Sequence, residues 1–108
     1  MATPEAKVKA AVVKILKAHD VYYFFPATGG YGRSGVPDII CCVKGRFVAI
    51  ECKANGNKPT ELQLRELHKI HKANGITMVI DEHGIDTVKA LMEVAENWSE
   101  THDSIDGD

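Results

Sequence analysis

The chain has 108 residues, of which 44% are hydrophobic and 26% are charged, and its formal net charge is −2. This length allows one domain with a modest core, and no hydrophobic run reaches the roughly 18 residues of a membrane-spanning helix. The N-terminal segment is charged from its start, which argues against a signal peptide. Three cysteines without a C-x-x-C pair argue against a zinc knuckle and favour a reducing, intracellular, cytoplasmic location.

The small net charge conceals an uneven distribution along the chain. Residues 1–72 carry twelve basic and six acidic residues, a net charge of +6. Residues 73–108 carry nine acidic residues and one lysine, a net charge of −8. A basic body with an acidic tail suits an anionic partner such as nucleic acid, although a solvated surface with a solubilising tail produces the same pattern.

The first half of the chain contains signals for a helix, a strand and a hairpin. Thr3 followed by Pro4 is typical of a helix N-terminus, and hydrophobic residues then recur at helical spacing. A β-branched and aromatic run follows, and Lys44-Gly45 separates two further apolar runs as a hairpin turn would. The expected elements are a helix over 4–19, a strand over 21–26, a glycine-rich loop over 27–36, and hairpin strands over 38–43 and 46–52.

The second half contains signals for a helix, a strand and a final helix. Thr60 is the expected N-cap of a helix that ends at Asn74-Gly75. The inward stripe expected for this helix is Leu64, Leu67, Ile70 and His71. A strand over 76–80, a helix over 85–98 and an acidic tail over 99–108 complete the chain. The expected order is α-β-β-β-α-β-α, in one domain over residues 1–98.

The segment "GGYGRSGVPD" at 29–38 contains the G-x-G-x-x-G pattern of dinucleotide-binding loops. That pattern binds a pyrophosphate only where it opens a helix, and here Val36-Pro37 leads into a strand. We therefore expect no nucleotide cofactor. The glycines can instead form a mobile loop that lets Arg33 and Ser34 approach a phosphate chain, or simply a flexible connection.

The hairpin makes a specific geometric prediction about two acidic residues. If Lys44-Gly45 is the turn, the register places Asp38 directly opposite Glu51, with β-carbons roughly 4.5–5.5 Å apart. Strand alternation places Lys53 on the face of Glu51 and turns the Cys52 side chain to the other face. Two carboxylates and an ammonium group should therefore meet at the open end of the hairpin.

Two directly opposed carboxylates are unfavourable unless a cation lies between them. Mg²⁺ prefers such oxygen ligands, and the backbone carbonyl of Cys52 is a further possible ligand. Lys53 can then orient a nucleophilic water or neutralise charge in the transition state. The simpler alternative, in which Glu51 pairs with Lys53 at a strand end, does not explain an acid that closes the apolar run "FVAI".

Several other polar residues are candidates with two interpretations each. Glu5 lies on the inward side of the first helix, where it can be a site residue or a partner of the helix dipole. Gln63 lies inward on the second helix, where it can be a site residue or part of a capping box with Thr60. The candidate phosphate contacts beyond the glycine-rich loop are Lys44, Arg46, Lys58 and Arg65.

Asp38 followed by Glu51-Cys52-Lys53 resembles the PD-(D/E)xK nuclease signature. The wider pattern "GRSGVPDII…FVAIECKA…PTELQ" is similar to the VRR-NUC domain over roughly residues 1–95, a nuclease module found in phages and bacteria and in a eukaryotic repair nuclease. The resemblance implies a restriction-endonuclease-like α/β fold with helices flanking a mixed sheet. It implies metal ligation by Glu5, Asp38, Glu51 and the Cys52 carbonyl, a catalytic Lys53, and an active-site Gln63.

The same resemblance implies DNA cleavage with Mg²⁺, for which Mn²⁺ can substitute. Stand-alone members are similar to Holliday-junction resolvases and act as homodimers, so branched DNA is the expected substrate. Two alternatives remain open at this point: a DNA-structure-binding module that does not cut, and a restriction-type endonuclease with the same catalytic core.

Overall fold

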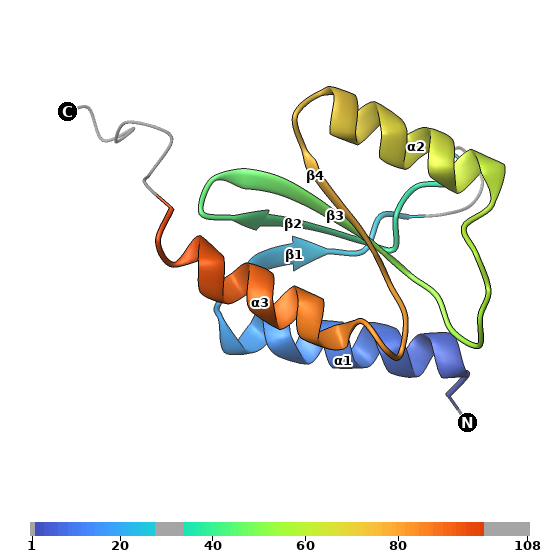
Figure 1. Cartoon of the computed structure of the whole chain (residues 1–108), viewed down its shortest axis with the longest axis horizontal. Coiled ribbons are helices and arrows are strands. Elements are labelled where there is room, and N and C mark those ends of the chain that lie inside the picture. Colours follow the sequence, from blue (N-terminus) through green and yellow to red (C-terminus); the bar gives the residue numbers. More distant parts are fainter. Residues whose placement is uncertain (1, 28–33, 99–108) are drawn as a thin grey trace.

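A computed structural model describes residues 2–27 and 34–98. Within these ranges four strands form one sheet in the order β1-β2-β3-β4, with helices on both of its faces (Figure 1). The first three strands are antiparallel, and β4 runs parallel to β3. The elements are α1 (Pro4–Ala18), β1 (Tyr22–Phe24), β2 (Ile39–Val43), β3 (Arg46–Cys52), α2 (Glu61–Lys72), β4 (Ile76–Ile80) and α3 (Ile85–Ala95). The α/β fold and the predicted order of elements are confirmed.

Helix α1 begins as its sequence predicts. The Thr3 hydroxyl accepts a hydrogen bond of 3.1 Å from the backbone N–H of Ala6, and Pro4 occupies the first turn. Its inward residues Val8, Val12 and Leu16 are buried against the sheet and α3. None of the helices in the described ranges is long and apolar enough to cross a membrane.

The hairpin turn has a geometry that Gly45 favours and that Lys44 also adopts. Lys44 and Gly45 both have positive φ, 51° and 84°, as a two-residue type I′ turn requires. The turn pairs Val43 with Arg46, and the ladder continues to the pair of Ile39 with Ile50. The predicted register is therefore confirmed along the whole of β2.

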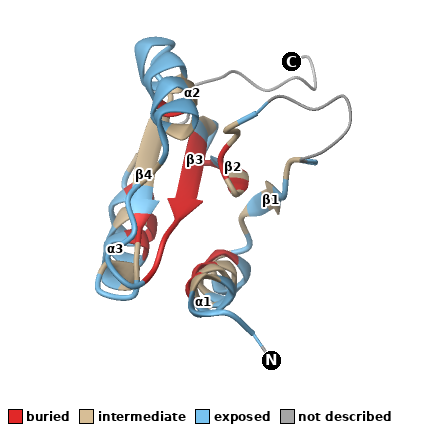
Figure 2. Ribbon diagram, turned by 90° about the vertical axis from the view of Figure 1, so that its right-hand side faces the viewer, coloured by how far each residue is buried: buried red, intermediate tan, exposed pale blue. Residues whose placement is uncertain are grey.

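The two faces of the sheet have different roles. Residues Ile39, Cys41, Val48, Ile50 and Cys52 face α1 and α3 and form the centre of the core. The alternate residues of β3 face the side on which α2 lies, and β3 is buried along most of its length (Figure 2). Glu51 is one of these alternate residues, so an acidic side chain is buried on the face opposite the main core.

Three expected features differ from the structure. Strand β1 covers only Tyr22–Phe24, because β2 offers it partners only from Ile40 to Cys42. Helix α3 ends at Ala95 rather than at residue 98. After the helix, the Trp98 ring packs against the Arg46 guanidinium, whose Cζ atom lies 4.3 Å from the ring centroid.

The third difference is the inward face of α2. Leu64 is 52% exposed and His71 is also exposed, whereas Leu67 is buried and Ile70 half-buried. Helix α2 contacts the sheet at β4, and Leu67 and Ile70, rather than Leu64 and His71, lie on the covered side of the helix. Glu66 lies on the covered side, with its side chain only 13% exposed.

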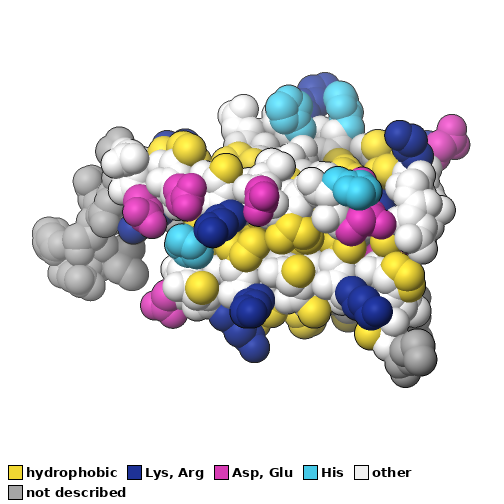
Figure 3. Space-filling model, turned by 60° about the horizontal axis from the view of Figure 1, so that its bottom comes forward, with side chains coloured by type: hydrophobic (Ala, Val, Ile, Leu, Met, Phe, Trp, Pro, Cys, Tyr) yellow, Lys and Arg dark blue, Asp and Glu magenta, His cyan; other side chains and the backbone are white. Residues whose placement is uncertain are grey.

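On the face viewed in Figure 3, a band of hydrophobic side chains separates a row that contains several acidic groups from a cluster of Lys and Arg side chains. The separation reflects the sequence, since α1 carries most of its charge as lysine and α3 carries more acidic than basic residues.

Candidate active site

Asp38 and Glu51 meet at the open end of the β2–β3 hairpin. Asp38 immediately precedes β2, and Glu51 lies one residue before the end of β3. The Asp38 Oδ2 atom accepts a hydrogen bond of 2.8 Å from the backbone N–H of Cys52. This bond fixes the Asp38 carboxylate beside the segment that carries Glu51 and Lys53.

Glu51 is buried without the partners that a buried carboxylate needs. The residue is 1% exposed, and neither of its carboxylate oxygens has a hydrogen-bond partner among the described residues. The Lys53 Nζ atom lies 3.4 Å from Oε2 and forms an ion pair with it, but not a well-oriented hydrogen bond. Buried polar atoms are nearly always paired, so this exception requires an explanation.

The raised pKa values of Glu51 and Cys52 also show that acidic groups are crowded at this site. Burial, with a further contribution from the nearby Asp38, raises the pKa of Glu51 from 4.5 to about 7, even though Lys53 opposes both effects. Burial likewise raises the pKa of the Cys52 thiol to about 12, with Asp38 and Glu51 adding to the effect. The lysine therefore compensates the acidic groups only in part, and the site favours additional positive charge.

The residues present fit a hard divalent cation. Carboxylate oxygens are the ligands that Mg²⁺ prefers, and this ion needs only one or two of them because it keeps several waters. The unpartnered oxygens of Glu51 and the carboxylate of Asp38 are oxygen ligands of this kind. Within residues 2–27 and 34–98, no three His, Cys, Asp or Glu side chains converge into a group that could hold a metal ion.

Glu5 faces the same site from α1. A cavity of about 200 Å³ is lined by Thr3, Glu5, Ala6, Lys9, Asp38 and Cys52. Glu5 is half-buried there, and its charge contributes to the raised pKa of Glu51. Glu5 therefore shares a cavity with Asp38 and lies near enough to affect Glu51, and its role as a metal ligand stays a prediction.

Comparison with known proteins agrees with this geometry. No family model matches the sequence. A solved structure described as a VRR_NUC domain has a TM-score of 0.67 and 25% sequence identity, and the match covers 85% of this chain and 97% of that one. A protein described as "Putative nuclease p44", from Acyrthosiphon pisum secondary endosymbiont phage 1, is 32% identical over 81 residues, which are 74% of this chain and 84% of the relative. The chain belongs to the VRR-NUC nuclease family.

Membership in the VRR-NUC family confirms the resemblance seen in the sequence. It makes the chain a nuclease domain, and it implies a DNA substrate and a divalent metal ion. The described residues after the glycine-rich segment lead into strand β2, so this segment does not open a helix as a dinucleotide-binding loop does.

Gln63 of this VRR-NUC domain makes the capping box that was one of its two interpretations. The Thr60 N–H donates to Gln63 Oε1 at 2.9 Å, and the Gln63 N–H donates to Thr60 Oγ1 at 3.2 Å. The first turn of α2 also contacts the glycine-rich loop, since a Cβ atom at Gly35 would lie 2.6 Å from the carbonyl carbon of Leu62. Gln63 thus lies beside the loop that leads to Asp38, and its active-site role remains a prediction.

The predicted DNA-binding residues fall into separate regions. Arg33 lies outside the described residues, whereas Ser34 is an exposed residue of the glycine-rich loop. Lys58 and Arg65 are exposed in the loop before α2 and on α2. Lys44 and Arg46 lie at the turn of the hairpin, which strand geometry places roughly 20 Å from the carboxylates. The structure therefore does not bring these last two residues to the site.

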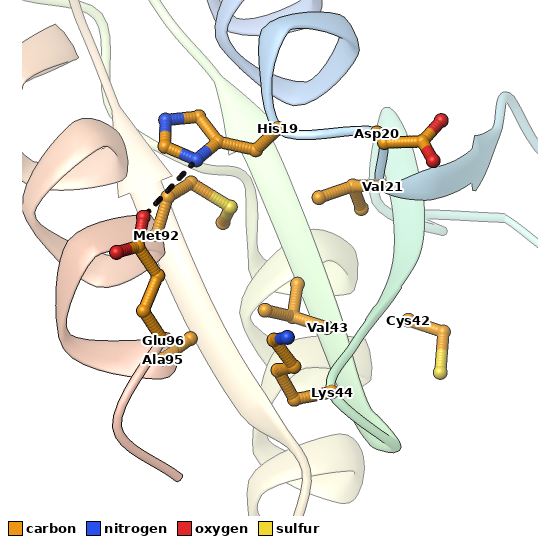
Figure 4. A pocket seen from close by; sticks show the side chains of 9 residues that line it. All are labelled: His19, Asp20, Val21, Cys42, Val43, Lys44, Met92, Ala95 and Glu96. Carbon is orange, nitrogen blue, oxygen red and sulfur yellow. Dashed lines mark ion pairs between the residues drawn. The ribbon is translucent and has the colours of Figure 1, made fainter.

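A larger cavity, of about 410 Å³, lies at the turn end of the hairpin (Figure 4). Its polar side chains come from the end of α1, the hairpin turn and the end of α3, and the His19 Nδ1 atom lies 3.9 Å from Glu96 Oε2. The smaller cavity is the better candidate for the VRR-NUC active site, because its lining includes Asp38 and Cys52, the sequence neighbour of the buried Glu51.

Sequence reasoning did not single out Lys9 as a residue of this site. Its Nζ atom lies 4.1 Å from the centroid of the Phe25 ring, and the residue lines the cavity that contains Glu5 and Asp38. A usable signal was present, because Lys9 lies four residues after Glu5 and thus on the same side of α1.

Proposed function

We propose that this VRR-NUC domain is a Mg²⁺-dependent DNA endonuclease that hydrolyses phosphodiester bonds, with Mn²⁺ able to replace Mg²⁺. The observation that carries the proposal is the buried Glu51 carboxylate, whose two oxygens have no hydrogen-bond partner among the described residues. Asp38 and Lys53 accompany it at the same end of the hairpin. A carboxylate pair beside a lysine is suited to metal-assisted phosphodiester hydrolysis.

Each residue has a defined role in the proposed reaction. Asp38 and Glu51 hold the cation, with the Cys52 carbonyl and Glu5 as further proposed ligands and Gln63 as a proposed active-site residue. When bound, the ion supplies a polarised phosphoryl oxygen and a water of lowered pKa. Lys53, whose Nζ atom lies 3.4 Å from Glu51, orients the attacking water or stabilises the negative charge that develops on the phosphate.

The proposed substrate is branched DNA, similar to a Holliday junction, and the proposed location is inside the cell. Ser34, Lys58 and Arg65 lie nearest to the glycine-rich loop and α2, and we propose that they contact the DNA backbone together with Arg33. Lys44 and Arg46, at the far end of the hairpin, are proposed to contact DNA away from the cleaved bond.

We further propose that the domain acts as a homodimer. Symmetric cleavage of two strands requires two active sites, and one 108-residue chain offers one. Light scattering on the purified protein tests this proposal, since a monomer at working concentration contradicts it.

A cleavage assay tests the activity. Labelled four-way junction, flap and duplex DNA are incubated with the protein, with Mg²⁺ or with EDTA. We expect metal-dependent products, most rapidly from the junction, and a loss of about 100-fold or more in Asp38→Asn, Glu51→Gln and Lys53→Ala, with DNA binding retained. Asp86→Asn, which changes an exposed carboxylate on α3, is the matched control.

Two results would contradict the assignment. A Glu51→Gln protein that cuts at the wild-type rate removes Glu51 from the catalytic site. DNA binding without any metal-dependent product identifies a DNA-structure-binding module instead. Thermal melting gives an independent readout, because Mg²⁺ should raise the melting temperature of the wild type and of Lys53→Ala but not that of Glu51→Gln.

A further inference from the structure

Helix α1 brings a second lysine to the carboxylate site. Lys9 is half-buried, whereas the other lysines of this helix, Lys7, Lys14 and Lys17, are exposed. Lys9 lines the cavity of about 200 Å³ that also contains Asp38 and Glu5. Its position therefore differs from that of an ordinary solvated lysine on a helix surface.

The ring of Phe25 holds the Lys9 side chain in place. The Lys9 Nζ atom lies 4.1 Å from the ring centroid, within the range of a favourable cation–π contact. Phe25 follows β1 and is 50% exposed, so its ring is used as a surface platform rather than as part of the core. A lysine side chain that is already oriented loses less conformational freedom when it binds an anion.

The charge of Lys9 is not neutralised by a direct partner. No carboxylate among the described residues lies within ion-pair distance of its Nζ atom, whereas the other lysine of the site, Lys53, is paired with Glu51 at 3.4 Å. The two lysines thus approach the carboxylates from different elements, Lys9 from α1 and Lys53 from the end of β3. Lys9 remains free to bind an anionic oxygen that enters the cavity.

We propose that Lys9 binds a non-bridging phosphate oxygen of the DNA backbone beside Asp38 and Glu51, and that Phe25 is its positioning residue. This inference rests on the proposed nuclease function and names the contact that draws the phosphodiester into the site. A lysine ammonium is a compact point charge that suits a phosphate oxygen.

The experiment compares Lys9→Gln with Lys14→Gln, which removes an exposed lysine from the same helix. We expect Lys9→Gln to raise the KM for junction DNA about fivefold or more, with kcat within about twofold of the wild-type value. The slope of the logarithm of the DNA-binding constant against the logarithm of salt concentration should decrease by about one. Lys14→Gln and Lys9→Arg should leave the KM near the wild-type value. Thermal melting establishes that every variant is folded.

Phe25 is tested through its effect on Lys9. Phe25→Leu removes the ring but keeps the lysine, so we expect a raised KM, whereas Phe25→Trp should restore the wild-type KM because indole also binds cations on its face. In a Lys9→Gln background, Phe25→Leu should have no additional effect on the KM.

Two outcomes would overturn the inference. A KM and a salt dependence of Lys9→Gln equal to those of Lys14→Gln would exclude phosphate binding. If Lys9→Gln lowered kcat and left the KM unchanged, Lys9 would act on the carboxylates of the site and not on the phosphate. In both cases a loss of cleavage in Glu51→Gln would still support the proposed nuclease, so the two failures are distinguishable.

Discussion

The Asp38 carboxylate and the Cys52 backbone N–H are joined by a hydrogen bond of 2.8 Å, which connects the start of β2 to the end of β3. Asp38 therefore has a structural role in addition to its proposed metal binding. Two substitutions distinguish these roles. An asparagine at position 38 can still accept the hydrogen bond from Cys52 through its side-chain oxygen, whereas an alanine cannot.

We expect Asp38→Asn to lose cleavage while the free energy of unfolding changes little. Asp38→Ala should also lose cleavage and should be less stable by about 0.5–1.5 kcal/mol, the usual net contribution of a hydrogen bond. Urea denaturation in the absence of divalent metal measures the difference. Equal stability of the two variants would show that the bond to Cys52 contributes nothing.

Glu51 predicts how stability depends on pH in the metal-free protein. Burial, with a further contribution from Asp38, raises the pKa of Glu51 from 4.5 to about 7, so between these values the folded chain keeps a proton that the unfolded chain has released. Deprotonation of Glu51 should therefore lower the free energy of unfolding by on the order of 3 kcal/mol as the pH rises from 4.5 to about 7. This loss of stability should persist at higher pH.

Glu51→Gln should remove this pH dependence and should be more stable than the wild type above about pH 7, because it replaces a buried charge by a neutral group. Urea denaturation at several pH values in EDTA tests the expectation. Glu61→Gln, which changes an exposed carboxyl on α2, serves as the control and should follow the wild-type curve. A wild-type stability that rises steadily through this window, with no difference in Glu51→Gln, would contradict the argument.

Gly35 and Gly56 form a matched pair for the role of the glycine-rich loop. Both have positive φ, 78° and 77°, but a Cβ atom at Gly35 would lie 2.6 Å from backbone atoms of Leu62, whereas a Cβ atom at Gly56 would meet nothing within 4 Å. Gly56→Ala should therefore show only the strain of left-handed backbone, about 1–2 kcal/mol.

Gly35→Ala should lose at least about 1 kcal/mol more, because the added methyl group pushes the loop away from the first turn of α2. Because this loop leads directly to Asp38, the Gly35→Ala variant should also cleave DNA more slowly. Urea denaturation and the cleavage assay give the two readouts. Equal loss of stability in both variants would mean that the contact with Leu62 does not hold the loop.

The three cysteines should differ strongly in reactivity. Cys42 is exposed, whereas Cys41 and Cys52 are buried, and burial raises the pKa values of their thiols to about 11 and about 12. Near neutral pH, a thiol reagent should modify one thiol per folded chain and three after denaturation. Cys42→Ser should abolish the rapid reaction, and rapid modification of Cys41 or Cys52 in the folded protein would contradict their burial.

The position of the carboxylate pair was predictable because it depends on local interactions. Gly45 favours a two-residue turn at Lys44-Gly45, and the resulting register pairs Ile39 with Ile50. Asp38 and Glu51 are therefore the next residues along the two arms, whatever the distant packing. The ends of α1 and α2 were predictable for a similar reason, since Thr3 and Thr60 each cap the helix that directly follows them.

The remaining features depend on how distant segments pack. The contact of Lys9 with Phe25 requires α1 to lie beside the end of β1, which helical spacing alone does not specify. The exposure of Leu64 likewise depends on the line along which α2 crosses β4. The role of Gln63 stayed ambiguous because its side chain closes the capping box while its backbone nitrogen lies beside Gly35 of the loop.

The type I′ turn at Lys44-Gly45 also limits how this protein can change in evolution. An insertion or deletion of one residue in either arm of the hairpin, between Asp38 and the turn or between the turn and Glu51, would rotate one acidic side chain to the opposite surface of the ribbon. Natural length variants that keep nuclease activity should therefore gain or lose residues here in even numbers, or compensate with a bulge. We therefore expect natural selection to constrain the distance along the chain between the two acids together with their chemical identity.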